Sequence, residues 1–205
     1  VDELDGHNIP CIGPTKELAK LETSKSFTRL LMQKYRIDAY PKFKIFETLS
    51  GINEFLKEVG EYVIKPDGLT GGKGVKIFGE HIHNSKEALD YCRDVLAQHA
   101  NVIIEEKLEG EEFSYQCIVD GKHVIGSPLA QDHKRAFEND TGPNTGGMGS
   151  YSCENHLLPF VSKQETDKAL EITEQMLAAI NRETKEHYRG IMYGGFIVTK
   201  DGVKL

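Results

Sequence analysis

The stretch Val63-Ile-Lys-Pro-Asp-Gly-Leu-Thr-Gly-Gly-Lys-Gly-Val-Lys-Ile-Phe78 places three lysines and four glycines between two short apolar runs. A glycine-rich turn exposes backbone N–H groups and a lysine adds positive charge, so this stretch predicts a site for an anion such as phosphate. From Val75 onward, apolar and polar residues alternate, which is typical of a strand. We therefore expect a glycine-rich hairpin that joins two strands and lies over phosphate groups.

Two familiar glycine motifs do not fit this stretch. The phosphate loop of many nucleoside triphosphatases needs G-x-x-x-x-G-K-[ST] before a helix. Here Asp67 stands at the first glycine position, and Gly74 replaces the serine or threonine. The dinucleotide fingerprint needs G-x-G-x-x-G at the start of a helix, whereas a strand is expected here. The hairpin is therefore a different type of phosphate site.

Composition limits the class of protein. With 205 residues, 39% hydrophobic and 28% charged, the chain is typical of a globular protein with one large domain or two small lobes. Its net charge of -7 gives no general attraction for nucleic acid or an anionic membrane. An acidic protein can still have a local basic pocket that binds a small anionic ligand. No metal-like spacing joins the four cysteines and no apolar run is long enough to span a membrane, so we expect reduced thiols and a cytoplasmic location.

The order of patterns predicts an α+β protein with mostly antiparallel pairing. Asn84 and Ser162 each begin a capping-box pattern that starts a helix, and Asp120-Gly121 between two extended runs predicts a hairpin. Residues 130–156 have no such periodicity and are expected to form a long irregular loop. The predicted division is a helical segment over residues 1–39 and two lobes over 40–107 and 108–205.

Three segments carry candidate site residues, each with a plain alternative. Lys65 follows a buried-type strand and precedes the glycine-rich loop, which favours a phosphate contact over a solvated lysine; Lys73 fits either reading. Residues 103–113 are either a polar linker or a hinge that offers backbone groups to adenine and a carboxylate to ribose. Residues 130–149 are either a surface loop or a second anion site, with cationic side chains and glycine amides, in which His133 has a positioning rather than a catalytic role.

In this order and spacing, these segments resemble the phosphoribosylamine–glycine ligase (glycinamide ribonucleotide synthetase) family of the ATP-grasp superfamily. The resemblance covers essentially the whole chain, and AQDHKRAFENDTGPNTGGMGSYS is its most distinctive part. The other motifs that carry it are Ile12-Gly-Pro-Thr-Lys16, Leu21-Glu-Thr-Ser-Lys-Ser-Phe27, VIKPDGLTGGKGV and IIEEKLEGEEFS. It implies an ATP-grasp fold with two lobes and a glycine-rich β-hairpin lid.

The resemblance also implies roles for single residues. The residues implied to face the ATP phosphates, or to form the lid over them, are Lys25, Lys65, Gly71, Gly72, Lys73 and Gly74. Those implied for adenine and ribose are Glu105, the backbone of Glu106 and Leu108, and Glu112. Those implied for phosphoribosylamine and glycine are Asp132, Lys134, Arg135, Asp140, Asn144, Thr145, Gly146 and Gly147. Lys65 and Arg135 are the residues expected to act in catalysis.

The family reaction activates the glycine carboxylate as glycyl phosphate, which the amine of phosphoribosylamine attacks, giving glycinamide ribonucleotide, ADP and phosphate in de novo purine biosynthesis. Mg²⁺ or Mn²⁺ is implied as well, with its main protein ligands expected beyond Leu205 and none within this chain. Since Asp201-Gly202 predicts a turn into a new strand just before the end, we expect a piece of a longer protein that binds nucleotide weakly and has little ligase activity alone.

One departure from the family is Pro66 where many relatives carry alanine, which a strand end accepts because only an N–H is lost. Two alternatives stay open. The chain could serve another ATP-grasp carboxylate–amine ligase, or it could be a nucleotide-binding module without turnover. The sequence leaves the oligomeric state open.

Overall fold

The computed structural model describes residues 1–70, 74–138 and 141–205, and within them the chain divides into two compact units. Unit 1 contains Val1–Lys20, Leu31–Ala39 and Glu109–Leu205, and unit 2 contains Leu21–Leu30 and Tyr40–Leu108. Residues 1–39, expected as one helical segment, are thus shared between the units, and the division falls within helix α3 (Lys25–Tyr35). The predicted domain boundaries stay a prediction.

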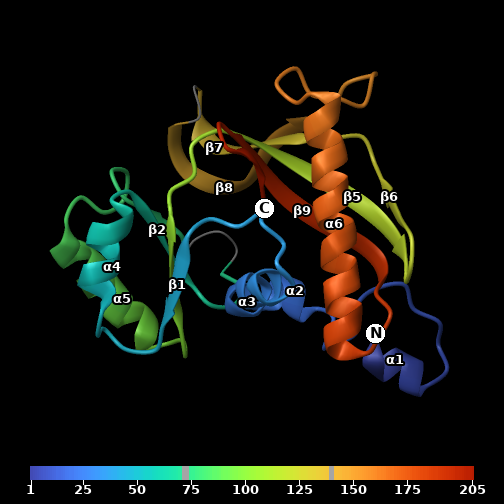
Figure 1. Cartoon of the computed structure of the whole chain (residues 1–205), viewed down its shortest axis with the longest axis horizontal. Coiled ribbons are helices and arrows are strands. Elements are labelled where there is room, and N and C mark those ends of the chain that lie inside the picture. Colours follow the sequence, from blue (N-terminus) through green and yellow to red (C-terminus); the bar gives the residue numbers. More distant parts are fainter. Residues whose placement is uncertain (71–73, 139–140) are drawn as a thin grey trace. The chain divides into compact units, whose positions relative to one another are not determined.

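Unit 2 is an antiparallel sheet with helices α4 (Ile52–Val59) and α5 (Ser85–Leu96) on one face (Figure 1). Its strand order is β1-β4-β2-β3, with β1 at Phe43–Phe46, β4 at Val102–Glu106, β2 at Tyr62–Pro66 and β3 at Lys76–Ile77. Side chains alternate along a strand, so Ile64 and Ile104 enter the core against the two helices while Lys65 and Glu105 point to the opposite face. The fold of this unit therefore determines which side can carry a polar site.

The hairpin predicted from the glycine-rich stretch is confirmed on its two strands. β2 and β3 pair antiparallel, with Val63 opposite Ile77 and Ile64 opposite Lys76. Gly74 lies where a Cβ would come within 2.8 Å of the Pro66 ring, so this position requires glycine for close packing. Gly71, Gly72 and Lys73 lie outside the described residues.

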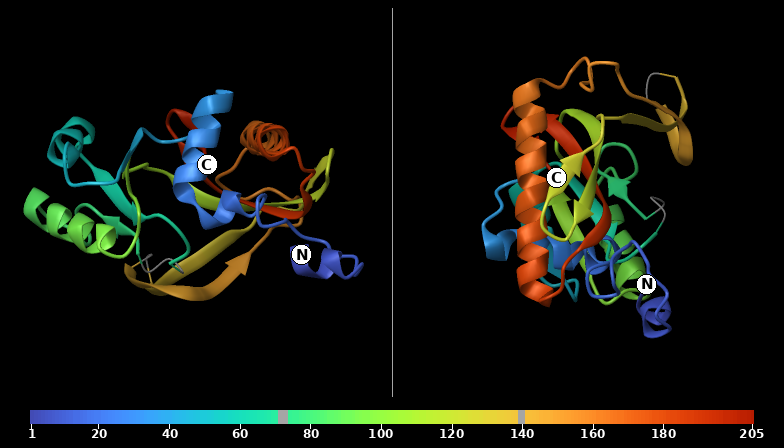
Figure 2. Two further views of the ribbon diagram at one scale, coloured as in Figure 1. Left: turned by 90° about the horizontal axis from the view of Figure 1, so that it is seen from below. Right: turned by 90° about the vertical axis from the view of Figure 1, so that its right-hand side faces the viewer.

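Unit 1 is built on a second antiparallel sheet, covered on one face by the long helix α6 (Lys163–Thr184), as Figure 2 shows end-on. Its strand order is β10-β9-β5-β6, with β10 at Gly202–Lys204, β9 at Arg189–Thr199, β5 at Glu111–Asp120 and β6 at Val124–Gly126. The hairpin predicted at Asp120-Gly121 and the capping box at Ser162 are both present. Phe113 and Phe196, opposite each other in the sheet, stack at 5.4 Å in the core beneath α6. Two short helices, α1 (Asp2–Gly6) and α2 (Lys20–Thr23), precede α3.

The expectation of an irregular loop over residues 130–156 is wrong. Most of this segment forms a two-stranded antiparallel ladder of β7 (Gln131–Phe137) and β8 (Thr141–Tyr151). The register shifts twice, between His133 and Arg135 and between Arg135 and Phe137. Such bulges break the two-residue side-chain period, and glycines can still pair through their backbones, which explains why the sequence pattern did not reveal these strands.

The α+β class with antiparallel sheets is confirmed. Among the described residues, no helix combines the length and the apolar character that a membrane span requires.

Candidate functional site

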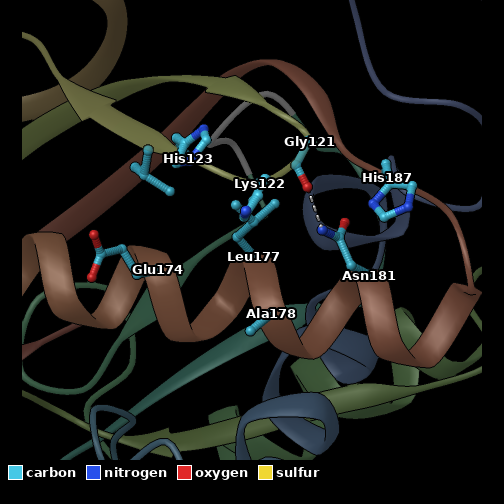
Figure 3. Close-up of a pocket in the computed structure, with 9 residues that line it drawn as sticks. Gly121, Lys122, His123, Glu174, Leu177, Ala178, Asn181 and His187 are labelled. Carbon is cyan, nitrogen blue, oxygen red and sulfur yellow. Dashed lines mark hydrogen bonds between the residues drawn. The ribbon is translucent and has the colours of Figure 1, made fainter.

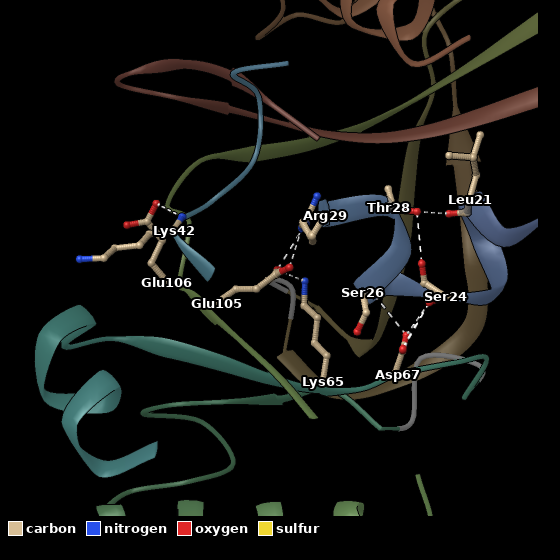
Figure 4. A network of polar contacts seen from close by, with 10 residues as sticks. All are labelled: Leu21, Ser24, Ser26, Thr28, Arg29, Lys42, Lys65, Asp67, Glu105 and Glu106. Atoms are coloured by element: carbon tan, nitrogen blue, oxygen red, sulfur yellow. Dashed lines mark hydrogen bonds and ion pairs between the residues drawn. The ribbon is translucent and has the colours of Figure 1, made fainter. Parts of the chain in front are cut away.

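The face of the unit 2 sheet opposite α4 and α5 carries a partly buried ion-pair cluster, shown in Figure 4. Lys65 on β2 and Glu105 on β4 are diagonal neighbours on this face, because Val63 is the residue directly opposite Glu105. The Lys65 ammonium lies 2.5 Å from Glu105 Oε2, and the Glu105 side chain is only 3% exposed. The lysine predicted to face phosphates is therefore paired with a carboxylate.

A second cation, Arg29 on α3, completes this pair. Its Nε donates to Glu105 Oε1 at 2.6 Å and its Nη2 donates to Oε2 at 3.4 Å. Burial alone would raise the pKa of Glu105, but the charges of Lys65 and Arg29 lower it to about 2. Glu105 is thus a fully ionised carboxylate held by two cations. The contact with adenine predicted for it stays a prediction.

Lys25, at the start of α3, adds a third cation to the cluster. Its ammonium donates to the carbonyl oxygen of Gly68 at 2.5 Å. Burial and then the positive charge of Lys65 lower its pKa, so the two lysines predicted to meet phosphate lie near each other in one partly buried region.

Asp67 connects the beginning of the glycine-rich loop to the first turn of α3. Its Oδ1 accepts hydrogen bonds from the backbone N–H of Ser26 at 3.2 Å and from the Ser24 hydroxyl at 3.3 Å. Burial would raise the pKa of Asp67, but these hydrogen bonds, beginning with the one from the Ser26 backbone, bring it below its ordinary value. The carboxylate therefore accepts a hydrogen bond from a backbone N–H in the first turn of α3 that has no partner within the helix, much as an N-cap residue does.

The cluster as a whole has an excess of positive charge. Three cations (Lys25, Arg29 and Lys65) face two carboxylates (Glu105 and Asp67), which gives a net charge of +1. A partly buried region with an uncompensated cation favours an anionic ligand that accepts hydrogen bonds.

Next to the charged cluster, the same face of the sheet is apolar. Phe43, Ile45, Val63 and Ile77 lie on this side of the sheet and are half-buried. Half-buried aliphatic and aromatic side chains on a flat sheet suit a planar ring. The face thus joins an apolar platform to a cationic end, the two features that a nucleotide requires.

The predicted hinge for adenine has part of its backbone already occupied. The N–H of Glu106 donates to the carbonyl oxygen of Lys42 at 2.8 Å, and the Glu106 carboxylate accepts from the N–H of Lys42 at 2.8 Å. The N–H of Lys107 donates to the carbonyl oxygen of Glu61 at 3.0 Å. The N–H of Glu106 is therefore not free for a ligand, and the contacts predicted for the Glu106 backbone and for Leu108 stay predictions.

In unit 1, several candidates for substrate contacts surround the buried residue Ser114. The Ser114 hydroxyl donates to Asp132 at 2.7 Å and lies 2.9 Å from the hydroxyl of Tyr193. Glu112 and Lys134 form an ion pair at 3.4 Å. Burial would lower the pKa of Lys134, but the Glu112 carboxylate and further neighbours raise it. Tyr193 is absent from the sequence-based candidates because its strand pattern indicates only sheet structure.

The other candidates of the β7–β8 ladder contact its own backbone or are exposed. Arg135 donates to the carbonyl oxygen of Gly142 at 2.8 Å, and Thr145 donates to that of Lys134 at 3.0 Å and accepts from the N–H of Gly147. Asn144 and Gly146 are exposed. Asp140 lies outside the described residues. Lys65 and Arg135, predicted to act in catalysis, belong to different units, and their joint role stays a prediction.

Unit 1 also contains a pocket of about 510 Å³ between α6 and the turn after β5, shown in Figure 3. None of the predicted site residues lines it. Asn181 on α6 donates to the carbonyl oxygen of Gly121 at 3.0 Å, so the pocket lies where a side chain holds this turn beside the helix. Within residues 1–70, 74–138 and 141–205, no group of three or more His, Cys, Asp or Glu side chains could hold a metal ion.

Comparison with known proteins identifies the family of the chain. The family model described as phosphoribosylglycinamide synthetase, ATP-grasp (A) domain, matches residues 23–205. Phosphoribosylamine–glycine ligase of Methanocella arvoryzae is 45% identical over 204 residues, which is 100% of this chain and 47% of that protein. The ligase of Methanocorpusculum labreanum is 48% identical over 206 residues, with the same two coverages. The chain thus spans about half the length of the curated relatives it matches.

Solved structures agree on the fold. The crystal structure of phosphoribosylamine–glycine ligase from Thermotoga maritima matches with a TM-score of 0.80 and 31% identity, over 95% of this chain and 49% of that one. D-alanine–D-alanine ligase from Bacillus anthracis, complexed with ATP, matches with a TM-score of 0.70 over 99% of this chain and 60% of that one. At 16% identity, the second match shows the shared fold alone.

Proposed function

Because the chain belongs to the phosphoribosylglycinamide synthetase ATP-grasp (A) domain family, we propose that it binds ATP for the ligation of glycine to 5-phosphoribosylamine. The proposed products are glycinamide ribonucleotide, ADP and phosphate, in purine biosynthesis. Since the chain spans about half the length of its relatives, we assign to it nucleotide binding and contacts with the two substrates rather than the whole reaction.

The observation that carries this proposal is the cationic excess of the unit 2 cluster. Three cations face two carboxylates beside a half-buried apolar platform. A nucleotide matches both features, because its ring system is apolar and flat and its phosphates are anionic.

In the proposed reaction, Lys25 and Lys65 neutralise phosphate charge and hold the phosphates in place. ATP transfers its γ-phosphoryl group to the glycine carboxylate, giving glycyl phosphate and ADP. The amine of phosphoribosylamine then attacks the carbonyl carbon of glycyl phosphate and displaces inorganic phosphate. The hairpin of β2 and β3 would exclude water that would otherwise hydrolyse the activated glycine. The residues proposed to contact glycine and phosphoribosylamine are Asp132, Lys134, Arg135, Asp140, Asn144, Thr145, Gly146 and Gly147.

For Mg²⁺ or Mn²⁺, the described residues provide no matching set of ligands. Hard divalent cations prefer several carboxylate or carbonyl oxygens, and the carboxylate of Glu105 is already occupied by two cations. We therefore assign no step to a metal ion held by these residues.

We also propose a cytoplasmic location. All four cysteines of the chain are free, and thiols stay reduced in that compartment.

A domain exchange tests the ligase function. The segment of the Methanocella arvoryzae ligase that matches this chain is replaced by residues 1–205, and ADP release is measured with ATP, glycine and phosphoribosylamine. We expect turnover that requires both substrates, whereas the 205-residue chain alone should show little. ADP release that needs a different amine would favour another ATP-grasp ligase. A folded exchange protein that binds ATP without turnover would favour a non-catalytic module.

A further inference from the structure

The two cations that bind Glu105 do so in different ways. Arg29 reaches both carboxylate oxygens, and its side chain is 13% exposed. Lys65 reaches one oxygen, Oε2, and its side chain is 23% exposed. Arg29 is therefore the deeper, two-point partner of the carboxylate, and Lys65 is the outer, one-point partner.

This difference determines which of the two cations can move away from Glu105. An ionised carboxylate in a buried site is strongly unfavourable unless a cation remains paired with it. If Lys65 turns away, Glu105 keeps its two contacts with Arg29 and stays paired. If Arg29 were absent, moving Lys65 would leave the buried carboxylate without a partner.

Repulsion from Lys25 favours movement of Lys65 toward an anionic ligand. Burial first, and then the positive charge of Lys65, lower the pKa of Lys25, so the two ammonium groups repel each other. An anion placed between the two lysines would remove this repulsion and attract both.

We infer that Arg29 is a positioning residue for the nucleotide site: it holds Glu105 so that Lys65 can pass from this carboxylate to the phosphates of the ligand. The inference rests on the proposed nucleotide binding and adds to it a residue that neither motif nor family resemblance indicated. Arg29 itself does not contact the ligand in this account.

The test measures binding of ATP and of inorganic tripolyphosphate to the 205-residue chain by isothermal titration calorimetry. Tripolyphosphate lacks adenine and ribose, so it reports on the phosphate end alone. The variants are Arg29→Met, Arg29→Lys, Glu105→Gln and the double variant Arg29→Met with Glu105→Gln. Arg93→Met is the matched control, since Arg93 forms an exposed ion pair with Asp90 in the same unit.

We expect Arg29→Met to weaken binding of both ligands by about tenfold or more, and Arg29→Lys to restore most of it, since a lysine keeps the charge. In the Glu105→Gln background, where no carboxylate has to be held, the Arg29→Met change should alter affinity less than about twofold. The Arg93→Met control should bind like the unaltered chain.

Equal affinity of Arg29→Met and the unaltered chain would overturn the inference. So would an equal loss in the Glu105→Gln background, because this would mean that Arg29 acts only through general stability. If Arg29→Met does not fold, as judged by its thermal transition, the double variant, which has no buried carboxylate to hold, is compared with Glu105→Gln: affinities within about twofold support the inference, and a loss of about tenfold overturns it. No binding of ATP by the unaltered chain would instead overturn the proposed function, and the inference with it.

Discussion

Acidification should remove a specific contribution of Glu105 to the stability of the chain. The pKa of this carboxyl is about 2 in the folded protein, against an ordinary value of 4.5. The difference of about 2.5, at about 1.4 kcal/mol for each pKa unit, corresponds to about 3–4 kcal/mol of stabilisation, of which about 3 kcal/mol is lost between about pH 5 and about pH 2. Since the side chain is only 3% exposed, screening by water does not reduce this value.

The direction follows from the lowered pKa. Folding favours the ionised form of Glu105, so the stabilisation is fully present above the unfolded value of 4.5 and is lost as the pH falls toward about 2. Protonation would leave Arg29 and Lys65 beside a neutral group, and their desolvation would no longer be compensated.

Urea unfolding followed by far-UV circular dichroism measures this effect. The free energy of unfolding is determined at several pH values between about 5 and about 2 for the unaltered chain and for Glu105→Gln. Other carboxylates contribute equally to both proteins, so they cancel in the difference. We expect the unaltered chain to lose about 3 kcal/mol more than Glu105→Gln over this range.

Glu58→Gln is the matched control, because Glu58 forms an exposed ion pair with Lys42 in the same unit. Its pH dependence should follow that of the unaltered chain. Parallel loss of stability in Glu105→Gln and the unaltered chain would refute the claim that Glu105 is ionised and paired in the folded state.

Three further substitutions test separate parts of the structure. Asp67→Ala removes the acceptor of the Ser26 N–H and should lower the free energy of unfolding by about 1 kcal/mol, and an unchanged urea midpoint would contradict this. Tyr193→Phe removes the hydroxyl beside Ser114 and should cost about 1 kcal/mol by the same assay, whereas a gain in stability would argue against that hydrogen bond. Ile64→Ala, at a fully buried core position, should cost about 2–5 kcal/mol, and a cost below about 0.5 kcal/mol would contradict the assigned register of β2.

Local signals in the sequence predicted the elements that depend on a few neighbouring residues. Asp120-Gly121 predicted the turn between β5 and β6, because this pair adopts the required backbone angles readily. Ser162 and Glu165 predicted the start of α6 through their reciprocal hydrogen bonds. These features need no information from distant parts of the chain.

The β7–β8 ladder has no local sequence signal of this kind. Its residues carry glycine and polar side chains that are typical of loops, and two register shifts remove the alternation that marks a strand. Pairing between the backbones forms the ladder, and a side-chain pattern does not report on it.

The site was predicted in part. The family resemblance indicated Lys25 and Lys65, and the structure places them near each other, but the pairing of Lys65 with Glu105 was not foreseen. Arg29 lies 76 positions from Glu105 in the sequence, so only the folded chain brings them together. One weak signal was available: Arg29 follows Lys25 by four residues in a predicted helix, which places both on one helix face.

Binding of ATP to the 205-residue chain, measured by isothermal titration calorimetry, tests the central claim most directly. The chain should bind ATP, and Lys25→Met and Lys65→Met should each weaken binding by about tenfold or more, equivalent to about 1.4 kcal/mol. Lys57→Met, at an exposed position of α4 in the same unit, should leave the affinity unchanged. Binding that is equally strong in all three variants would contradict the account, since it would show that the cationic cluster of unit 2 is not where the phosphates lie.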